Sequence, residues 1–364
     1  MESARSVLIF EQYIQSPKTR EQYRYHIEKF VNHYQLSSFD SILSLESEEL
    51  KQKIEDYVIL FKNRGKSHNY IRIIIFALQS FCDSNDKFGV NWKKIRKLLG
   101  KKQKPKKSRA YTTDEVKRML HSVKDLRSKA LILFLSASGV RRGAIPELKI
   151  KHLKEMPNDC LSVTVYGDSN EEYITFLNKE SKEALTLYFE RRKKDGEHLD
   201  LEHPVFRNKY VLGIERASVL SEKSVSNIIS RAKKNSGLDI DDSPNLLCHA
   251  FRRRFNTVLK LNREANYSLI ERLMGHDMKL DNSYFQPTLD DLFNEYQKGM
   301  SDLMIDDKER IMQEKKHIES KKIQLDQQQV EIKNQKDEIE TLKLKVERMI
   351  ETFEDKQSLK INNL

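Results

Sequence analysis

Apolar residues recur at helical spacing through the first hundred residues of the chain. One helix is predicted to begin at Ser16-Pro17, a second to cover residues 47–64 before Gly65, and a third to cover residues 67–83. Strand and turn signals are few in this stretch. The pattern therefore predicts a helical domain over residues 1–99.

Over residues 110–298 the apolar residues show helical spacing in some segments and strand-like alternation in others. Thr113 is predicted to cap a helix, and further helices are expected around residues 181–194 and 221–236. Between them, apolar and polar residues alternate over residues 161–177 on both sides of Gly167-Asp-Ser-Asn170, which predicts a β-hairpin. The predicted fold class is mainly α with a small antiparallel β-sheet.

Beyond residue 298 the apolar residues repeat every seven positions, which is typical of a coiled coil. The repeat consists of Met304, Ile311, Ile318, Leu325, Ile332, Ile339, Val346 and Phe353. The companion seam positions are polar until Leu342 and Met349, so the long helix or coiled coil predicted over residues 299–354 is weaker in its middle. A lone charged helix in solution is the alternative, and residues 355–364 are predicted to be a disordered tail.

The composition is that of a basic, soluble protein. The chain has 364 residues, of which 38% are hydrophobic and 33% charged, and its net charge is +11. No apolar run approaches the roughly 18 residues of a membrane span, and residues 1–20 are too charged for a signal peptide. We therefore expect a cytoplasmic protein with a polyanionic partner, although a basic charge can also serve solubility alone.

Residues 100–109 are basic, contain no acidic or apolar residue and have Pro105 at their centre. Nothing in this segment can contribute to a core, so it is predicted to be a linker whose charge would hold it against a polyanionic partner. Its predicted phosphate contacts are Lys101, Lys102, Lys104, Lys106 and Lys107. A plain flexible tether is the alternative.

The three cysteines, Cys82, Cys160 and Cys248, are scattered and form no Cys-x-x-Cys pair. This spacing predicts neither a disulfide framework nor a zinc site, and it indicates a reducing compartment. No metal and no cofactor is predicted. Cys248 precedes His249, but adjacent helical residues point about 100° apart, and no further ligand flanks them.

Side chains suited to a phosphate group stand between residues 249 and 284. His249 and Arg252 are one helical turn apart, His276 follows Gly275, and Tyr284 comes next. A guanidinium fits two phosphodiester oxygens, and an imidazole can transfer a proton near neutral pH. A phenol among cations is more acidic and therefore a better nucleophile. Each residue alone also has an ordinary role on a surface, in a cap or in packing.

The order His-x-x-Arg, Leu-x-Gly-His and Tyr resembles the C-terminal signature of the tyrosine recombinase, or phage integrase, family, which includes archaeal and phage integrases. The upstream turn Gly139-Val-Arg141 resembles that family's first box, with Arg142 as the structural alternative. The resemblance implies a site-specific DNA recombinase that breaks and rejoins DNA through a 3′-phosphotyrosyl intermediate. The implied catalytic residues are Arg141, His249, Arg252, His276 and Tyr284.

The same resemblance implies a helical DNA-clamping domain over residues 1–99, joined by the linker to a catalytic domain over residues 110–298. The implied partners are double-stranded DNA and further copies of the chain, as a tetramer on synapsed DNA. The resemblance also implies association with the nucleoid. Candidate phosphate contacts in the first domain are Arg20, Arg24, Lys66, His68 and Arg72. Each of them alone can equally be an ordinary surface charge.

The sequence departs from the family pattern at two positions. Ala144 stands where the family commonly has Glu, so a supporting hydrogen bond to Arg141 is either missing or supplied by Glu147. The family's catalytic lysine is expected in the hairpin turn, where this chain has Asn170 and no lysine. Lys179 and Lys182, beyond the second strand, are the alternative sources of that lysine.

These departures keep two other hypotheses open. A non-cleaving DNA-binding accessory protein could carry a degenerate form of the same site. A type IB topoisomerase-like enzyme would use the same chemistry to relax supercoils. Covalent trapping on DNA separates the first from an enzyme, and relaxation without recombinant product would indicate the second.

Overall fold

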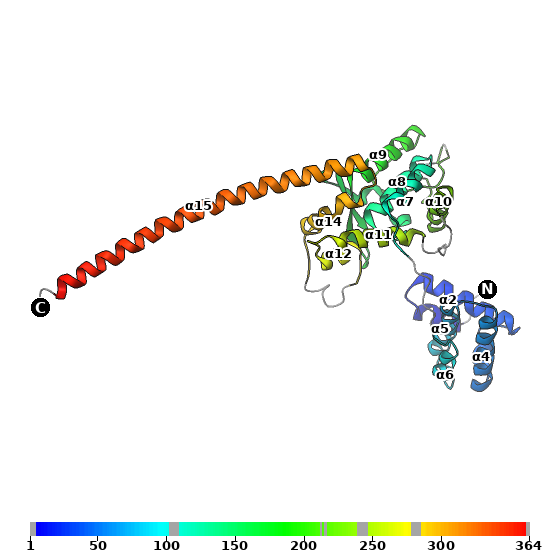
Figure 1. Cartoon of the computed structure of the whole chain (residues 1–364). Coiled ribbons are helices and arrows are strands. Elements are labelled where there is room, and N and C mark those ends of the chain that lie inside the picture. Colours follow the sequence, from blue (N-terminus) through cyan, green and yellow to red (C-terminus); the bar gives the residue numbers. More distant parts are fainter. Residues whose placement is uncertain are drawn as a thin grey trace. The chain divides into compact units, whose positions relative to one another are not determined.

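The computed structural model describes residues 5–101, 109–211, 213–214, 217–238, 247–277 and 285–361, without the side chains of residues 313, 316–317, 320–321, 324, 347–348 and 350–361. Contacts divide the chain into two compact units, Met1–Lys106 and Lys107–Leu364. Figure 1 shows the helices and strands of each unit.

The described part of the first unit is helical. Its elements are α1 (Arg5–Tyr13), α2 (Pro17–His33), α3 (Asp40–Ser44), α4 (Ser47–Asn63), α5 (His68–Ser84) and α6 (Trp92–Lys97). The predicted start at Ser16-Pro17 is confirmed, because the Ser16 side chain accepts a hydrogen bond from Thr19 N and Pro17 opens α2. Phe30, Ile54 and Leu78 are fully buried between these helices.

The second unit surrounds a small sheet with helices. Its elements are α7 (Thr113–Ser122), α8 (Leu126–Ser138), η1 (Arg142–Glu147), η2 (Ile150–His152), β1 (Leu153–Met156), β2 (Cys160–Val165), β3 (Tyr173–Leu177), α9 (Lys179–Lys194), α10 (Glu222–Asn235), α11 (Leu247–Leu261), α12 (Tyr267–Leu273), α14 (Leu289–Leu303) and α15 (Asp307–Ile361). The mainly helical fold class is therefore confirmed.

The predicted hairpin is confirmed as β2 and β3, which pair antiparallel with Val163 opposite Thr175. The strand β1, which the sequence did not predict, pairs antiparallel with β2 and completes the sheet order β1-β2-β3. Tyr173 opens β3 directly after the hairpin turn. The paired strands therefore fix the position of the hairpin turn.

The cap of α7 corrects the prediction at Thr113. Thr112 is the N-cap: its side chain accepts from Glu115 N, and the Glu115 carboxylate accepts from Thr112 N. Both threonines are suitable caps, but only Thr112 has a glutamate three residues later, which completes a capping box. Thr113 is the first helical residue.

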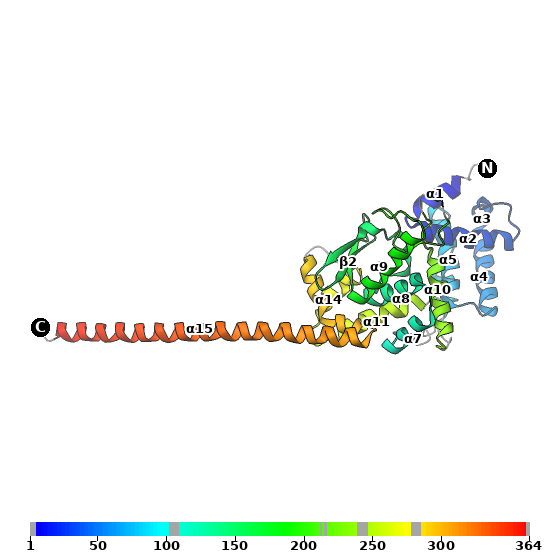
Figure 2. The same cartoon turned by 90° about the horizontal axis from the view of Figure 1, so that it is seen from above.

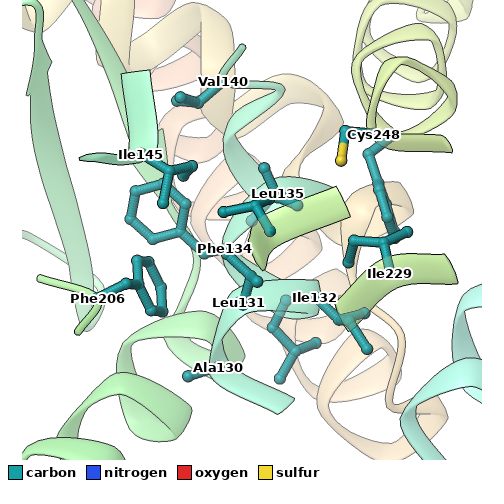
Figure 3. Close-up of a cluster of buried hydrophobic side chains, with 14 of the residues drawn as sticks. Ala130, Leu131, Ile132, Phe134, Leu135, Val140, Ile145, Phe206, Ile229 and Cys248 are labelled. Carbon is teal, nitrogen blue, oxygen red and sulfur yellow. The ribbon is translucent and has the colours of Figure 1, made fainter. Parts of the chain in front are cut away.

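The helix α8 is buried on all sides from Ala130 onward and forms the centre of the second unit's core. Leu131, Phe134 and Leu135 are fully buried and pack among residues of neighbouring elements (Figure 3). The helix ends at Gly139, where φ is +61° and an added Cβ would lie 2.7 Å from Phe255 Cγ. Only glycine fits this turn, which leads to Arg141.

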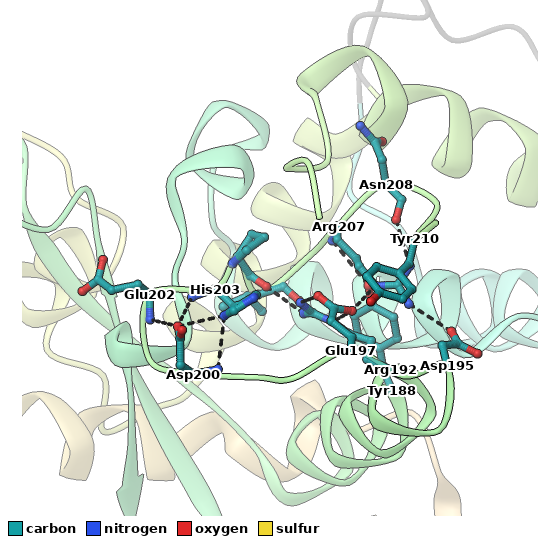
Figure 4. Close-up of polar contacts among 12 residues, drawn as sticks. Tyr188, Arg192, Asp195, Glu197, Asp200, Glu202, His203, Arg207, Asn208 and Tyr210 are labelled. Carbon is teal, nitrogen blue, oxygen red and sulfur yellow. Dashed lines mark hydrogen bonds and ion pairs between the residues drawn. The ribbon is translucent and has the colours of Figure 1, made fainter. Parts of the chain in front are cut away.

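A buried ion-pair network holds the end of α9 (Figure 4). Arg192 Nη2 lies 2.6 Å from Glu197 Oε1, and both side chains are almost fully buried. Arg192 also donates to the carbonyls of Pro204 and Val205. The Arg192 guanidinium thus binds a carboxylate and two backbone oxygens, so we assign it to the fold and not to the site.

The segment predicted as a long helix or coiled coil, residues 299–354, includes the end of α14 and most of α15, one continuous helix (Figure 2). The helix α15 continues to Ile361, within the stretch predicted as a tail. None of the described helices is both long and apolar enough to cross a membrane. In the described part of the chain no three His, Cys, Asp or Glu side chains gather as a metal site. Cys82, Cys160 and Cys248 are free and buried.

Candidate active site

Two arginines of the predicted site are held by one turn. Arg141 Nη2 donates to the carbonyl of Gly275 at 2.9 Å, and Arg252 Nη2 donates to the carbonyl of Met274. Arg252 Nη1 also donates to Gly139 O at 2.9 Å. The turn follows the C-terminus of α12, where helix carbonyls favour positive charge. Both guanidinium groups are therefore fixed in place by backbone oxygens.

This turn requires glycine at position 275. Gly275 has φ +58°, and an added Cβ would lie 2.3 Å from Cδ1 of Tyr173, which opens β3. The close approach of backbone to ring brings His276 next to the sheet. Burial raises the pKa of Tyr173, so its phenol stays protonated.

His276 is oriented by Glu271, a residue that the sequence analysis missed. Its Nδ1 contacts Glu271 Oε2, and Lys260 Nζ contacts Glu271 Oε1. Burial alone would raise the pKa of Glu271, but hydrogen bonds from Lys260 and His276 outweigh it and hold that pKa below its ordinary value. A carboxylate on Nδ1 fixes the ring and leaves Nε2 for other contacts. The available sequence signal was a glutamate one helical turn upstream of the Gly-His pair.

Two pockets share Arg141. An open pocket of about 670 Å³ is lined by Arg141, Asn170, Glu171, Glu172, Tyr173, Arg272, Gly275, His276 and Asp277. A second, of about 200 Å³, is lined by Val140, Arg141, Arg142, Gly143, Glu222, Cys248, His249 and Arg252. The structure therefore brings four of the five predicted catalytic residues together, and Arg141 lies where the two pockets meet.

His249 lies in the first turn of α11, on the side of the second pocket. Desolvation lowers its pKa below the ordinary value, and the positive charges of Arg253, Arg252 and Arg141 add to the effect. A histidine with a lowered pKa is neutral at pH 7. The imidazole is therefore in the form that can accept a proton.

Tyr284, the predicted nucleophile, lies outside the described residues. Its neighbour Phe285 is described, and the carbonyl of Phe285 accepts a hydrogen bond of 2.5 Å from Arg272 Nη2. Arg272 also lines the larger pocket, together with Arg141 and His276. The sequence analysis missed Arg272, whose only signal was a basic residue four positions before His276.

Two other tyrosines near the signature are poorer nucleophiles. Tyr296 has no exposed surface, and burial raises its pKa well above the ordinary value. Tyr267 is 60% exposed, and its hydroxyl donates to the carbonyl of Lys260 at 3.4 Å. Neither Tyr267 nor Tyr296 lines the two pockets.

The hairpin turn places Asn170 on the larger pocket, where the family resemblance predicted a lysine. The alternative lysines are bound elsewhere: Lys179 pairs with Glu309 at 3.0 Å and Lys182 with Glu155 at 2.5 Å. Both follow the opposite end of β3 from the turn. The structure thus offers neither Lys179 nor Lys182 to the pocket.

The two arginines of the first box, Arg141 and Arg142, have different partners. Arg142 Nη2 lies 3.3 Å from Glu222 Oε2, and Arg142 Nη1 donates to Ser226 Oγ at 2.8 Å, so this side chain binds α10. Ala144 is buried, whereas Glu147 is exposed. Among the described residues no ion pair is recorded between Glu147 and Arg141, and backbone carbonyl Gly275 O supports that arginine instead.

The candidate phosphate contacts of the first unit have different surroundings. Arg24 pairs with Glu11 at 2.7 Å and with Glu28 at 3.2 Å, and Arg20 donates to Ile14 O. Contacts with rings or helix starts hold the others: Lys66 lies over Tyr70, Arg72 over Phe76, and His68 opens α5. In the linker Lys101 is exposed, and Lys102, Lys104, Lys106 and Lys107 lie outside the described residues.

Residues 109–284, which span both arginine boxes and end at Tyr284, match the phage integrase family. Over these residues the chain resembles the phage integrase family, as predicted. The family consists of DNA strand-transferring enzymes, so the predictions of family and enzyme class are confirmed. The accessory-protein and topoisomerase-like alternatives are not favoured.

Several tyrosine recombinases are similar in sequence. Tyrosine recombinase XerA of Saccharolobus solfataricus is 26% identical over 243 residues, which cover 66% of this chain and 70% of that protein. Tyrosine recombinase XerC of Lactobacillus leichmannii is 27% identical over 212 residues, covering 56% of this chain and 66% of that protein. The chain thus spans about two thirds of the length of these relatives.

Solved structures share the fold. The Tn1549 transposon integrase in complex with transposon right end DNA has a TM-score of 0.53 and 15% identity, covering 80% of this chain and 98% of that chain. A lambda integrase tetramer bound to a Holliday junction has a TM-score of 0.51 and 17% identity, covering 78% of this chain and 75% of that chain.

Proposed function

We propose that the protein is a site-specific DNA recombinase or integrase in which Tyr284 attacks a phosphodiester. The phenolic oxygen forms a bond to phosphorus, the 5′-oxygen leaves with a proton as a hydroxyl, and a 3′-phosphotyrosyl bond remains. The phosphoester energy is kept, so a second 5′-hydroxyl can reverse the step on another strand without ATP.

One observation carries the proposal: Arg141, His249, Arg252 and His276 line two adjoining pockets that share Arg141. These residues come from the turn after α8, from α11 and from the turn after α12. A structural role alone would not require two guanidinium groups to converge on one turn beside an open cavity. Phe285, which follows Tyr284 in the sequence, accepts a hydrogen bond at its carbonyl from Arg272, and Arg272 lines the larger of these pockets.

The roles follow from charge and protonation. Arg141 and Arg252 would neutralise charge that develops on the phosphorane oxygens, at little reorganisation because carbonyls already hold them. Neutral His249 would accept the phenol proton. His276, with Nδ1 on Glu271, would offer Nε2 to the phosphate from the other pocket.

DNA binding and assembly belong to the same proposal. The first unit would clamp duplex DNA through Arg20, Arg24, Lys66, His68 and Arg72, and the linker lysines would follow the backbone between the units. The relatives in solved structures include one described as bound to DNA and one as a tetramer on a Holliday junction. We extend both properties to this chain, as a protein of the DNA-containing cytoplasm.

The helix α15 would join protomers through a coiled coil. Its apolar residues at seven-residue spacing are exposed, as shown by Ile318 at 67% and Leu325 at 57%. Exposed apolar stripes of this spacing pair with other helices. Removal of residues after Asp306 would then reduce self-association while keeping the catalytic residues.

Nicked suicide substrates that span candidate sites test the proposed cleavage. Loss of the short strand from the nick prevents religation, so an active enzyme accumulates as a covalent protein–DNA adduct. We expect an adduct that resists denaturant and disappears on protease digestion. DNA retention without any adduct would instead indicate the non-cleaving accessory protein.

A further inference from the structure

The seven-residue stripe of α15 can be assigned to one of two seam positions, and the flanking residues decide between them. The stripe residues Leu325, Ile332, Ile339 and Val346 are between 52% and 57% exposed. If the stripe occupies the first seam position of the heptad, the second holds Gln328, Gln335, Leu342 and Met349. The other assignment would put Lys336 and Lys343 in the seam. The first therefore gives an apolar seam from Ile339 onward.

Charges beside this seam favour parallel helices. Glu331 and Glu338 precede stripe residues, whereas Lys336 and Lys343 follow stripe residues by four positions. In two parallel copies in the same register, Glu331 faces Lys336 of the second copy and Glu338 faces its Lys343, on both sides of the seam. In antiparallel copies the row that contains Lys336 and Lys343 would face its own equivalent, cation against cation.

The same geometry disfavours pairing nearer the predicted catalytic domain, residues 110–298, which we call the catalytic unit. In the parallel register Arg310 would face Lys315 of the second copy, and like charges at these positions repel. The second seam position holds Glu314 there, and glutamines at 328 and 335. The sequence of α15 thus changes from a helix that resists pairing to one that favours it.

The base of α15 is bound firmly to the catalytic unit. The Glu180 carboxylate accepts from Ile305 N at 2.9 Å and from Asp306 N at 3.1 Å. Lys117 lies 2.7 Å from Asp307, and Lys179 lies 3.0 Å from Glu309. The direction in which α15 begins is therefore set by the catalytic unit.

We propose that α15 pairs with α15 of a second copy as a parallel, in-register, two-stranded coiled coil over residues 331–349, with residues 307–324 unpaired. Ile and Val at the first seam position with Leu at the second favour two strands. Each unpaired segment spans about 27 Å at 1.5 Å per residue. Two catalytic units can thus stay joined while they occupy separate positions on DNA. This inference rests on the proposed self-association through α15.

Sedimentation of the full-length protein without DNA tests the seam with two matched leucines. Leu342 and Leu344 are 55% and 53% exposed, but they lie on different faces of α15. We expect Leu342→Gln to weaken self-association about tenfold or more, because a polar amide enters the seam. Leu344→Gln should leave it unchanged. Equal effects of both substitutions would overturn the assigned seam.

Cysteine cross-linking tests the orientation. In a parallel, in-register pair Ile332→Cys and Leu342→Cys should each form a disulfide between copies, whereas Leu344→Cys should not. An antiparallel pair can link identical positions only near its symmetry axis, so one link or none in a self-associating protein would overturn the proposal. The parent protein is the control, because burial raises the pKa of Cys82 and of Cys160 to about 12 and that of Cys248 to about 11.

Charge reversal provides an independent readout. Lys336→Glu combined with Lys343→Glu should weaken the pair about tenfold or more, since acidic residues would then face Glu331 and Glu338. Mixing this variant with one that carries Glu331→Lys and Glu338→Lys should restore association as a mixed pair. An unchanged affinity of the first variant would contradict the parallel register. A monomeric parent would contradict α15 pairing as a whole, and adduct formation on nicked DNA would show separately whether the recombinase function holds.

Discussion

Arg252, Arg253 and Arg254 are consecutive, and their surroundings differ. Arg252 lies in the pocket with its guanidinium on Gly139 O and Met274 O. Arg254 is buried and donates to the carbonyls of Asp302 and Leu303 at the end of α14, and burial lowers its pKa to about 10. The family signature predicted the first role. No local pattern predicted the second, because the carbonyls that Arg254 binds come from a helix nearly fifty residues away.

At the same scale, Gly275 is the residue whose replacement should disturb both fold and site. Gly275→Ala should lower the free energy of unfolding by about 2 kcal/mol or more, because the Cβ adds a clash with Tyr173 to the strain of positive φ. Gly237→Ala is a matched control in the same unit: its φ is +67°, but the added Cβ would meet only Arg118 Nη2 at 3.7 Å. We expect the control to cost about 1 kcal/mol. Urea unfolding checks both values, and equal costs would contradict the close packing at Gly275.

The protonation state of His249 gives a pH prediction. Its pKa lies below the ordinary value, so the ring is neutral at pH 7 and takes up a proton only as the pH falls below about 6.5. The rate of adduct formation at low DNA concentration, which reports the free enzyme, should therefore be flat from pH 7 to 8 and decrease below that range. The His249→Ala variant should form the adduct slowly, and its rate should not decrease further at acid pH. A rate that rises toward acid pH would assign His249 the opposite role, as a proton donor.

At the scale of elements, alternation along residues 161–177 was sufficient to predict β2 and β3. The strand β1 was not predictable, because its four residues show no alternating burial and its place is set by pairing with β2. The convergence of the site was equally invisible, since contacts from Arg141 and Arg252 to the turn at Gly275 depend on tertiary packing. Local pattern thus predicted the elements, and the family resemblance predicted which residues meet.

The turn between β2 and β3 supports a prediction about the missing lysine. The parent should cleave DNA with a 5′-bridging phosphorothiolate about 10²- to 10⁴-fold faster than ordinary DNA, because a thiolate leaves without a proton donor. Asn170→Lys should raise cleavage of ordinary DNA, since Asn170 already lines the pocket. Lys179→Ala should change neither rate, because Lys179 pairs with Glu309. Slower cleavage of only the ordinary substrate by Lys179→Ala would show that this lysine serves the site after all.

At the scale of the whole molecule, two separately packed units are joined by a basic segment in a chain of net charge +11. The composition predicts a linker at this point of the chain, because residues 100–109 contain nothing that can enter a core. Composition could not predict how the two units are placed on DNA, since that placement depends on the contacts of both units with the duplex.

Glutamine substitution of Lys101, Lys102, Lys104, Lys106 and Lys107 measures the contribution of the linker. Each lysine that neutralises a phosphate releases counterions, so its loss should reduce the slope of log affinity against log salt by roughly 0.9. Binding should be measured on one duplex over a range of salt concentrations. Glutamine at five exposed lysines outside the linker and outside the proposed seam contacts, Lys209, Lys308, Lys315, Lys322 and Lys333, is the charge-matched control. The same slope in the linker variant and the parent would make the segment a passive tether.

The identity of the residue that becomes attached to DNA is the most direct test of the proposed mechanism. After trapping on a nicked substrate and protease digestion, mass spectrometry should find the nucleotide on the peptide that contains Tyr284. Tyr284→Phe should retain DNA binding and form no adduct, whereas Tyr267→Phe should form it at the parent's rate, because Tyr267 lines neither pocket. An adduct formed by Tyr284→Phe, or a nucleotide found on any other residue, would contradict attack by Tyr284.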